Sequence, residues 1–155
     1  MKKLFILVFL VSMSFTAEAQ QLNWHKDVNE AISASNKEKK PLLMFFTGSD
    51  WCGWCIRLQN EVLKTPEFQK WAEENVILVE LDYPRRTAQD NDIRNQNAAL
   101  QQAFGIQGFP TVYFTNAETD NGKVNFKGLG KTGYVAGGPS AWLAVADGIL
   151  KSQKL

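Results

Sequence analysis

The sequence predicts an α/β domain in which helices flank a central mixed β-sheet. Two short and almost wholly apolar runs, 42–46 and 76–82, are typical of strands that are buried on both faces of a sheet. Segments with apolar residues at helical spacing lie between and around these runs, and strand–helix–strand units favour a parallel strand pair. Later in the chain, Asn121-Gly122 is a tight-turn signal that adds an antiparallel hairpin.

The first half of the chain predicts three helices. The first is indicated by apolar residues at helical spacing, which are Trp24, Val28, Ala31 and Ile32. It is expected to end before Pro41. The second follows a turn at 47–50 and opens at a cysteine motif, and the third covers 66–74 with Thr65 as its N-cap.

The second half predicts two helices and a hairpin. One helix carries apolar residues on a single face and can end at Gly105; these residues are Ile93, Leu100 and Phe104. Strands at 111–114 and 124–127 form the predicted hairpin. A glycine-rich loop at 128–138 then leads to a last helix that opens at Pro139.

The composition indicates one globular domain and no attraction to polyanions. The chain has 155 residues, of which 45% are hydrophobic and 21% are charged. Its 17 basic and 16 acidic residues give a formal net charge of +1, so we expect no binding to nucleic acid.

The N-terminal residues have the pattern of an export signal. Lys2 and Lys3 precede the apolar run 4–11, and Ala17-Glu18-Ala19 fits the cleavage pattern of small residues. The alternative is an uncleaved membrane anchor, but the apolar stretch is shorter than the roughly 20 residues that span a bilayer. We therefore expect a cleaved signal peptide at 1–19 and a domain at 20–155, exported to the periplasm or a similar compartment where disulfides persist.

Two cysteines, Cys52 and Cys55, stand at the junction between a buried strand and a helix. This spacing and placement predict a reversible, redox-active disulfide. The alternatives are a permanent structural disulfide, although so small a loop restrains a chain poorly, or two buried thiols. Zinc normally takes four Cys or His ligands, whereas the chain offers these two cysteines and the distant His25, so we expect no metal and no cofactor.

The two cysteines are expected to have different roles in disulfide exchange. Cys52 lies at the start of the helix, where unpaired backbone N–H groups favour the thiolate, so it is the predicted attacking thiol. Cys55 lies one turn further in and is the predicted resolving thiol, which attacks the mixed disulfide on Cys52 and releases the substrate.

The motif Trp51-Cys52-Gly53-Trp54-Cys55 after a hydrophobic strand, with Gly108-Phe109-Pro110-Thr111 further on, resembles the thioredoxin superfamily. More narrowly, the segments 46–52 and Gly133-Tyr134 are similar to those of exported bacterial thioredoxin-like proteins related to thioredoxin disulfide reductases. The resemblance covers nearly all of the mature chain and implies a three-layer thioredoxin-like fold.

The same resemblance implies a substrate-binding surface beside the cysteines. Pro110 would be a cis-proline and Phe109 would present its backbone to an extended substrate segment, the alternative being a trans turn proline. Trp51, Gly53 and Trp54 would complete this surface. Of the two tryptophans, we expect Trp51 to pack against the fold and Trp54 to contact the partner.

The sequence departs from the family at the proton acceptor of the second cysteine. Thioredoxins usually have a buried aspartate six residues before the first cysteine, and this position is Phe46. Glu80 or Asp82 could replace that base, unless these carboxylates are only a solvated strand end. Similarly, Arg85 and Arg86 are either a solvated pair of charges or a guide for an acidic partner.

These features predict an exported protein-disulfide reductase. Gly53-Trp54 lacks the histidine that strongly oxidising relatives carry between the cysteines, which favours a reductant. Its expected partners are protein disulfides and a membrane or soluble thiol reductase as electron donor, and we expect a monomer. The alternatives are a disulfide oxidase or isomerase, and a non-catalytic binding module with a thioredoxin fold.

Overall fold

The computed structural model describes residues 22–152, so the predicted signal peptide at 1–19 lies outside the described residues. In chain order the elements are β1 (Trp24–His25), α1 (Val28–Glu38), β2 (Leu42–Thr47), α2 (Gly53–Leu58), the π-helical turn η1 (Gln59–Leu63), α3 (Pro66–Asn75), β3 (Ile77–Asp82), α4 (Asn91–Ala103), β4 (Thr111–Asp120), β5 (Lys123–Thr132) and α5 (Gly138–Lys151). Within the described residues, no helix is long and apolar enough to cross a membrane.

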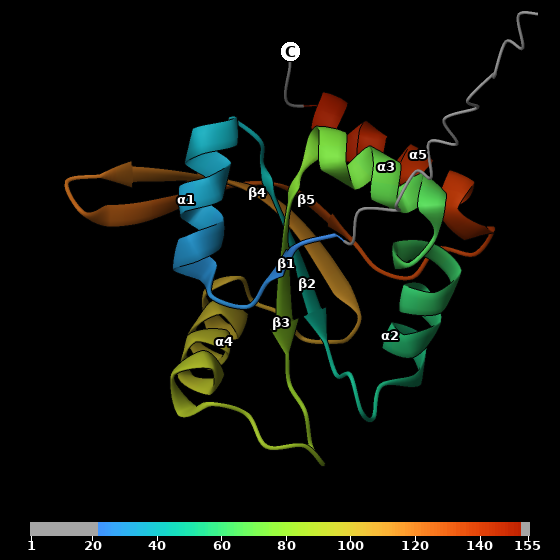
Figure 1. Cartoon of the computed structure of the whole chain (residues 1–155), viewed down its shortest axis with the longest axis horizontal. Coiled ribbons are helices and arrows are strands. Elements are labelled where there is room, and N and C mark those ends of the chain that lie inside the picture. Colours follow the sequence, from blue (N-terminus) through green and yellow to red (C-terminus); the bar gives the residue numbers. More distant parts are fainter. Residues whose placement is uncertain (1–21, 153–155) are drawn as a thin grey trace, which may run out of the picture.

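The five strands form one mixed sheet in the order β1-β3-β2-β4-β5 (Figure 1). β3 is parallel to both β1 and β2, whereas β4 is antiparallel to β2 and to β5. The central strand β2 is buried along its whole length, because helices cover both faces of the sheet. The predicted mixed sheet is confirmed, and so is its parallel central pair.

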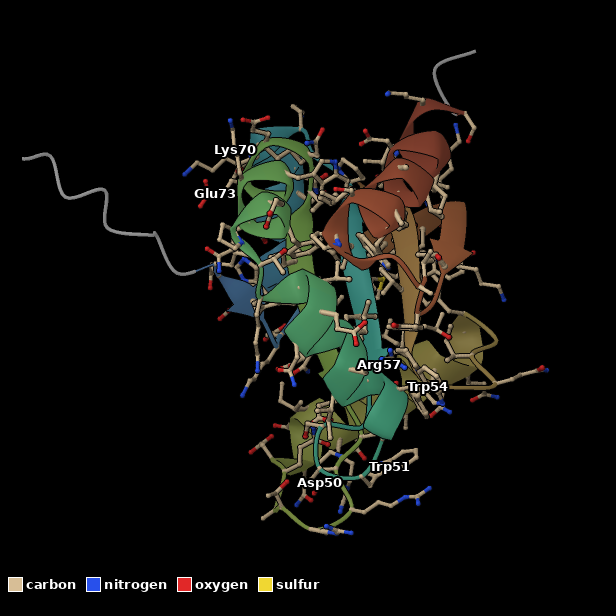
Figure 2. All side chains as sticks on the ribbon, turned by 90° about the vertical axis from the view of Figure 1, so that its right-hand side faces the viewer. Asp50, Trp51, Trp54, Arg57, Lys70 and Glu73 are labelled. Atoms are coloured by element: carbon tan, nitrogen blue, oxygen red, sulfur yellow. A yellow bond between two sulfur atoms is a disulfide. The ribbon has the colours of Figure 1, made fainter. Side chains whose placement is uncertain are left out.

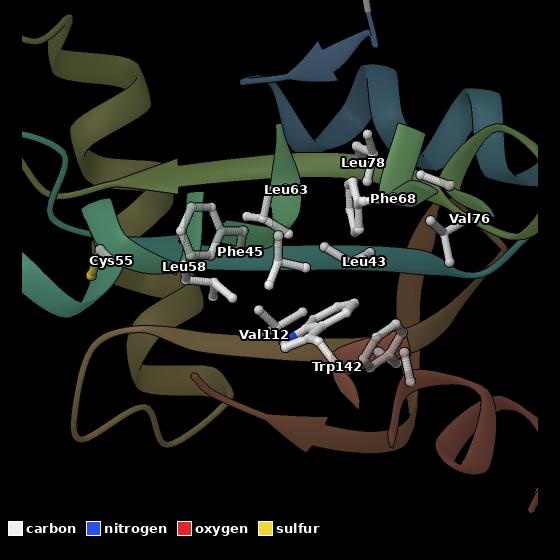
Figure 3. Packing of buried hydrophobic residues seen from close by; sticks show 14 of the residues in the cluster. Leu43, Phe45, Cys55, Leu58, Leu63, Phe68, Val76, Leu78, Val112 and Trp142 are labelled. Atoms are coloured by element: carbon white, nitrogen blue, oxygen red, sulfur yellow. The ribbon is translucent and has the colours of Figure 1, made fainter. Parts of the chain in front are cut away.

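The two faces of the sheet carry separate hydrophobic clusters, which gives the predicted three-layer fold. Side chains alternate along β2, so Leu43 and Phe45 face α2, η1, α3 and α5, while Met44 and Phe46 face α1 and α4. Figure 3 shows the first cluster, in which Cys55 lies at one end of a row of apolar side chains. The redox motif is thus anchored in the larger of the two cores.

The first helix is shorter at its start than the sequence predicts, and Trp24 is not part of it. Asp27 is the N-cap of α1 and its carboxylate accepts a hydrogen bond of 2.7 Å from the backbone N–H of Asn29. Trp24 instead belongs to β1 and pairs with β3. Its ring stacks on Phe68, with 6.4 Å between the ring centroids, and lies 6.0 Å from the ring centroid of Phe45. The helical spacing of Trp24 reflects its packing against the core and not a helix.

The hairpin is longer than predicted, and residues 128–132 belong to strand β5 rather than to a loop. The glycines there serve close packing. A Cβ on Gly128 would lie 2.7 Å from the hydroxyl oxygen of Tyr113, and one on Gly130 would lie 2.8 Å from a side-chain carbon of Ile149. Composition alone does not distinguish such glycines from those of a flexible loop.

Candidate active site

Cys52 and Cys55 are joined by a disulfide at the start of α2, the helix that follows β2 in the chain. Cys52 is the N-cap of α2, and its sulfur accepts a hydrogen bond of 3.2 Å from the backbone N–H of Cys55. The Cα atoms of the pair are 5.2 Å apart. An N–H group directed at the Cys52 sulfur stabilises a negative charge there, which favours Cys52 as the thiolate when the pair is reduced.

The two sulfur-bearing residues differ in access to solvent. Cys52 is 6% exposed and Cys55 is completely buried among the apolar side chains of the larger core. Between them, Gly53 is exposed and a Cβ on it would meet no atom within 4 Å. Of the two cysteines, Cys52 is therefore the one that a partner sulfur can approach from solvent.

Trp51 is half-buried and tied to two other loops. Its indole N–H donates a hydrogen bond of 2.7 Å to the carbonyl oxygen of Tyr83, and its ring meets Phe109 edge-on at 5.8 Å between centroids. Gly48 leaves room for the ring, because a Cβ on that residue would lie 2.4 Å from a ring carbon. Trp51 thus fixes the redox loop against the loops that follow β3 and precede β4.

Trp54 projects outward and is 56% exposed (Figure 2). Its ring lies 5.1 Å from that of Tyr134 and 5.3 Å from the guanidinium of Arg57. Glu61 joins these neighbours, since it accepts hydrogen bonds from Arg57 at 2.7 Å and from the Tyr134 hydroxyl. The Tyr134 hydroxyl is the main reason that the pKa of Glu61 is low, followed by Arg57.

The Phe109-Pro110 peptide bond is cis. The loop that contains it lies beside the redox loop through the contact between Phe109 and Trp51, and Phe109 also packs on Tyr83 at 5.0 Å between ring centroids. A Cβ on Gly133 would lie 3.1 Å from the carbonyl oxygen of Pro110. The segment Gly133-Tyr134 therefore connects the cis-proline loop with the side chains around Trp54.

Comparisons with known proteins agree with this geometry. Residues 28–133 match the model of the thioredoxin-like domain family. The chain belongs to the thioredoxin-like family. It is 35% identical over 133 residues to a disulfide bond reductase, DsbH, of Chlamydia pneumoniae, a match that covers 86% of this chain and 75% of that one.

Two further relatives support the same family. The thioredoxin-related protein DsbJ of Chlamydia pneumoniae is 37% identical over 101 residues, which are 65% of this chain but only 29% of that longer protein. A solved structure of a DsbH oxidoreductase has a TM-score of 0.74 and 33% identity, and covers 84% of this chain and 85% of its own. With a disulfide in a Cys-x-x-Cys motif, this thioredoxin-like chain is a thiol–disulfide oxidoreductase.

Of the two phenylalanines of β2, the one that lies on the same sheet face as Cys55 is Phe45. It is not Phe46, which lies six residues before Cys52 in the sequence. Phe46 lies on the sheet face opposite to Cys55, where its ring is 6.1 Å from that of Phe104. Phe45 occupies the face of the redox pair. β2 therefore offers Cys55 no carboxylate, because both residues are apolar.

Of the two candidate replacement bases, only Glu80 has an uncommitted carboxylate. Asp82 accepts hydrogen bonds from the backbone N–H and the hydroxyl of Ser49, at 2.8 and 2.6 Å. Glu80 pairs with Phe45 across the parallel strands and lines a cavity of about 170 Å³ between the sheet and η1. Its burial, and secondarily the charge of Asp82, raise the pKa of Glu80, while Lys26 opposes the shift.

One residue of this thioredoxin-like site has no counterpart among the sequence predictions, namely Asp50. Its carboxylate accepts hydrogen bonds from the backbone N–H groups of Arg85, Arg86 and Thr87 at 3.0, 2.7 and 3.0 Å. These bonds, with that of Arg85 foremost, hold the pKa of Asp50 below its ordinary value. A carboxylate next to the Trp-Cys motif was visible in the sequence, but only the fold shows that the loop after β3 reaches it.

His25 lies apart from these residues, in β1, where its ring nitrogens lie near Asn23 and Glu30. Residues 22–152 contain no group of three or more His, Cys, Asp or Glu side chains that could hold a metal ion.

Proposed function

We propose that this protein is an exported protein-disulfide reductase in which Cys52 attacks and Cys55 resolves. The observation that carries the proposal is the unequal access of the two cysteines: Cys52 keeps 6% of its surface exposed beside the exposed Gly53, whereas Cys55 is completely buried. Only a sulfur at the position of Cys52 can meet a partner disulfide. The name of the relative DsbH, a disulfide bond reductase, supports the same direction of electron flow.

The reaction runs in two exchange steps. The Cys52 thiolate attacks one sulfur of the substrate disulfide, forms a mixed disulfide and expels the other substrate sulfur as a thiolate, which takes up a proton. Cys55 then loses its proton and attacks the Cys52 sulfur, which closes the disulfide of the present structure and releases the second substrate thiol. Two electrons and two protons pass to the substrate.

The surface around the pair suits an extended polypeptide substrate. Trp54, with more than half its surface exposed, offers apolar area at one side of Cys52. Trp51, Gly53, Phe109 and the cis-Pro110 loop form the other side, where we propose that the backbone of the substrate pairs. Partners would be protein disulfides, and a membrane or soluble thiol reductase would return the oxidised protein to its dithiol form.

Export is part of the proposal because it determines which substrates the protein meets. The signal-like pattern at 1–19 supports delivery to the periplasm, where the protein would act as a monomer on disulfides that form outside the cytoplasm.

The deciding experiment is the reduction potential of the Cys52–Cys55 pair, measured with the purified protein against glutathione and followed by tryptophan fluorescence. Trp51 and Trp54 flank the disulfide, so their emission should report its state. A potential near that of thioredoxin, about −270 mV, is expected for a reductant. A potential near about −120 mV would make the protein a disulfide donor and would overturn the proposed direction.

A further inference from the structure

The loop that carries Arg85 and Arg86 is fixed against the redox loop by several hydrogen bonds. Asp50, two residues before Cys52, accepts three backbone N–H groups of residues 85–87 and the hydroxyl of Thr87. The bond from Trp51 to the carbonyl oxygen of Tyr83 and the pair of bonds between Ser49 and Asp82 add to this connection. The two loops therefore present one surface, although more than 30 residues separate them in the chain.

Arg85 is positioned at the cysteines by its side chain as well. Its guanidinium carbon lies 3.6 Å from the centroid of the Trp51 ring, which belongs to the residue directly before Cys52. A guanidinium stacked on an indole keeps its N–H donors free in its own plane, where they can bind a carboxylate with two hydrogen bonds. Since both its backbone and its side chain are already held, Arg85 loses little conformational entropy when it binds a partner.

The carboxylates near this surface form no ion pair with the side chains of the two arginines. Asp50 and Asp82 are engaged by backbone N–H groups and by hydroxyls, and Glu61 by Arg57 and Tyr134. Among the described residues, neither Arg85 nor Arg86 forms an ion pair, and both side chains are exposed. The guanidinium groups of Arg85 and Arg86 are therefore available to a partner's carboxylate beside Cys52, although the Asp50 carboxylate keeps its negative charge.

We propose that Arg85 and Arg86 select substrates that carry an acidic side chain close to the reacting disulfide. Since an extended chain advances about 3.3 Å per residue, and Arg85 stacks on the residue next to Cys52, the carboxylate is expected within about three residues of the attacked cysteine. Arg85 would bind this carboxylate with two hydrogen bonds, and the positive charge of Arg86 would raise the rate at which the acidic substrate associates. This inference rests on the proposed function and deepens it by naming the substrate class.

The test uses three disulfide-bonded peptides that differ only in the residues two positions from each cysteine, which are Glu, Gln or Lys. The protein is reduced beforehand and its oxidation by each peptide is followed by stopped-flow tryptophan fluorescence at low and high salt. We expect the Glu peptide to react roughly three- to tenfold faster than the Lys peptide, with the difference shrinking at high salt.

Variants separate a local effect from one of net charge. The double substitution Arg85→Glu with Arg86→Glu should reverse the order of the Glu and Lys peptides. Its matched control, Lys123→Glu with Lys127→Glu, makes the same change of charge on the distant β4–β5 hairpin and should keep the original order. Arg85→Lys keeps the charge but loses the planar group, so the preference should become weaker without being reversed.

Equal rates for the three peptides would overturn the proposal. So would a uniform slowing of all peptides by the double substitution, since that result would assign the arginines to the reactivity of Cys52 instead. If the protein proves to be an oxidant, the same peptides in their dithiol form are oxidised by it, and their order of rates still reports on the arginines. Failure of the charge preference is thus distinguishable from failure of the proposed direction.

Discussion

Glu80 of β3 lies directly across from Phe45 of β2, on the face of the sheet that also carries Cys55. The central strand has an aromatic ring where a carboxylate would be expected in a thioredoxin, and the carboxylate is found on the neighbouring strand. The cavity of about 170 Å³ that Glu80 lines is large enough to hold water. Among the two candidate bases, Glu80 is therefore the carboxylate that we expect to take up the proton of Cys55.

Replacing Glu80 by Gln should slow the resolving step. Without the carboxylate, Cys55 must lose its proton to bulk solvent, and we expect closure of the disulfide to fall by about a hundredfold, the lower end of a general base's contribution. The measurement is a single turnover with a mixed disulfide to a coloured aromatic thiol, whose release reports the attack of Cys55. Glu74→Gln, at an exposed carboxylate of α3, is the matched control, and resolution at the wild-type rate in Glu80→Gln would refute the role.

The same substitution should change the pH dependence of stability. The pKa of Glu80 is raised above its ordinary 4.5, so the folded state binds more protons than the unfolded state between that value and the raised one. Ionised Glu80 therefore destabilises the fold as pH rises through this window. Glu80→Gln should be more stable than the wild type at pH 7 in urea unfolding, and the difference should disappear below about pH 4.

Serine substitutions distinguish the roles of the cysteines. Cys52→Ser should reduce the rate of insulin reduction by dithiothreitol to that of dithiothreitol alone, because the attacking sulfur is gone. Cys55→Ser should still attack and should accumulate as a mixed disulfide, visible as an added mass under non-reducing conditions. If Cys52→Ser matched the wild type in this assay while partner binding persisted, the non-catalytic binding module would be the better description.

The sequence was sufficient for the parts of the fold that depend on local patterns. The buried strands, the Thr65 N-cap and the tight turn at Asn121-Gly122 were predicted correctly, because each follows from a few adjacent residues. The assignment of Trp24 to a helix was wrong, since spacing reports burial and not the partner that provides it. The redox pair was found from spacing and from its place between a strand and a helix.

The rest of the site depends on contacts between distant segments. Asp50 holds a loop 35 to 37 residues away in sequence, and Tyr134 bonds to Glu61 across 73 residues, so neither contact has a local signal. The choice between Glu80 and Asp82 also needed the fold. Both follow apolar residues at the end of the same strand, and they are separated by the bonds from Ser49 to Asp82 and by the cavity that Glu80 lines.

Replacing Asp50 by Ala should release the loop that follows β3. Three backbone N–H groups lose their acceptor, so amide exchange at residues 85–87 should become faster, as measured by hydrogen exchange with mass spectrometry. Glu74→Ala, at an exposed carboxylate on α3, should leave these amides unchanged.

In the wild type, acid should have the same effect as the Asp50→Ala substitution. The pKa of Asp50 is lowered by the N–H of Arg85 above all, so its contribution is present above the ordinary value of 3.8 and is lost as pH falls through the lowered pKa. Corrected for the intrinsic pH dependence of exchange, protection of residues 85–87 should therefore fall in this acidic range. Protection that persists in the Asp50→Ala variant at neutral pH would show that other bonds hold the loop.

Adding one methyl group at Gly48 tests whether the position of Trp51 matters. A Cβ there would lie 2.4 Å from the Trp51 ring, so Gly48→Ala must displace the ring or the turn, and overpacking of this kind costs about 1–3 kcal/mol. Displacement of the ring should also break its bond to Tyr83, alter tryptophan emission and slow the attack by Cys52. Gly148→Ala in α5 is the matched control, because its Cβ meets no atom within 4 Å and it lies outside the redox loop. Equal unfolding midpoints in urea and equal reduction rates for the two variants would mean that the redox loop does not require Trp51 in this place.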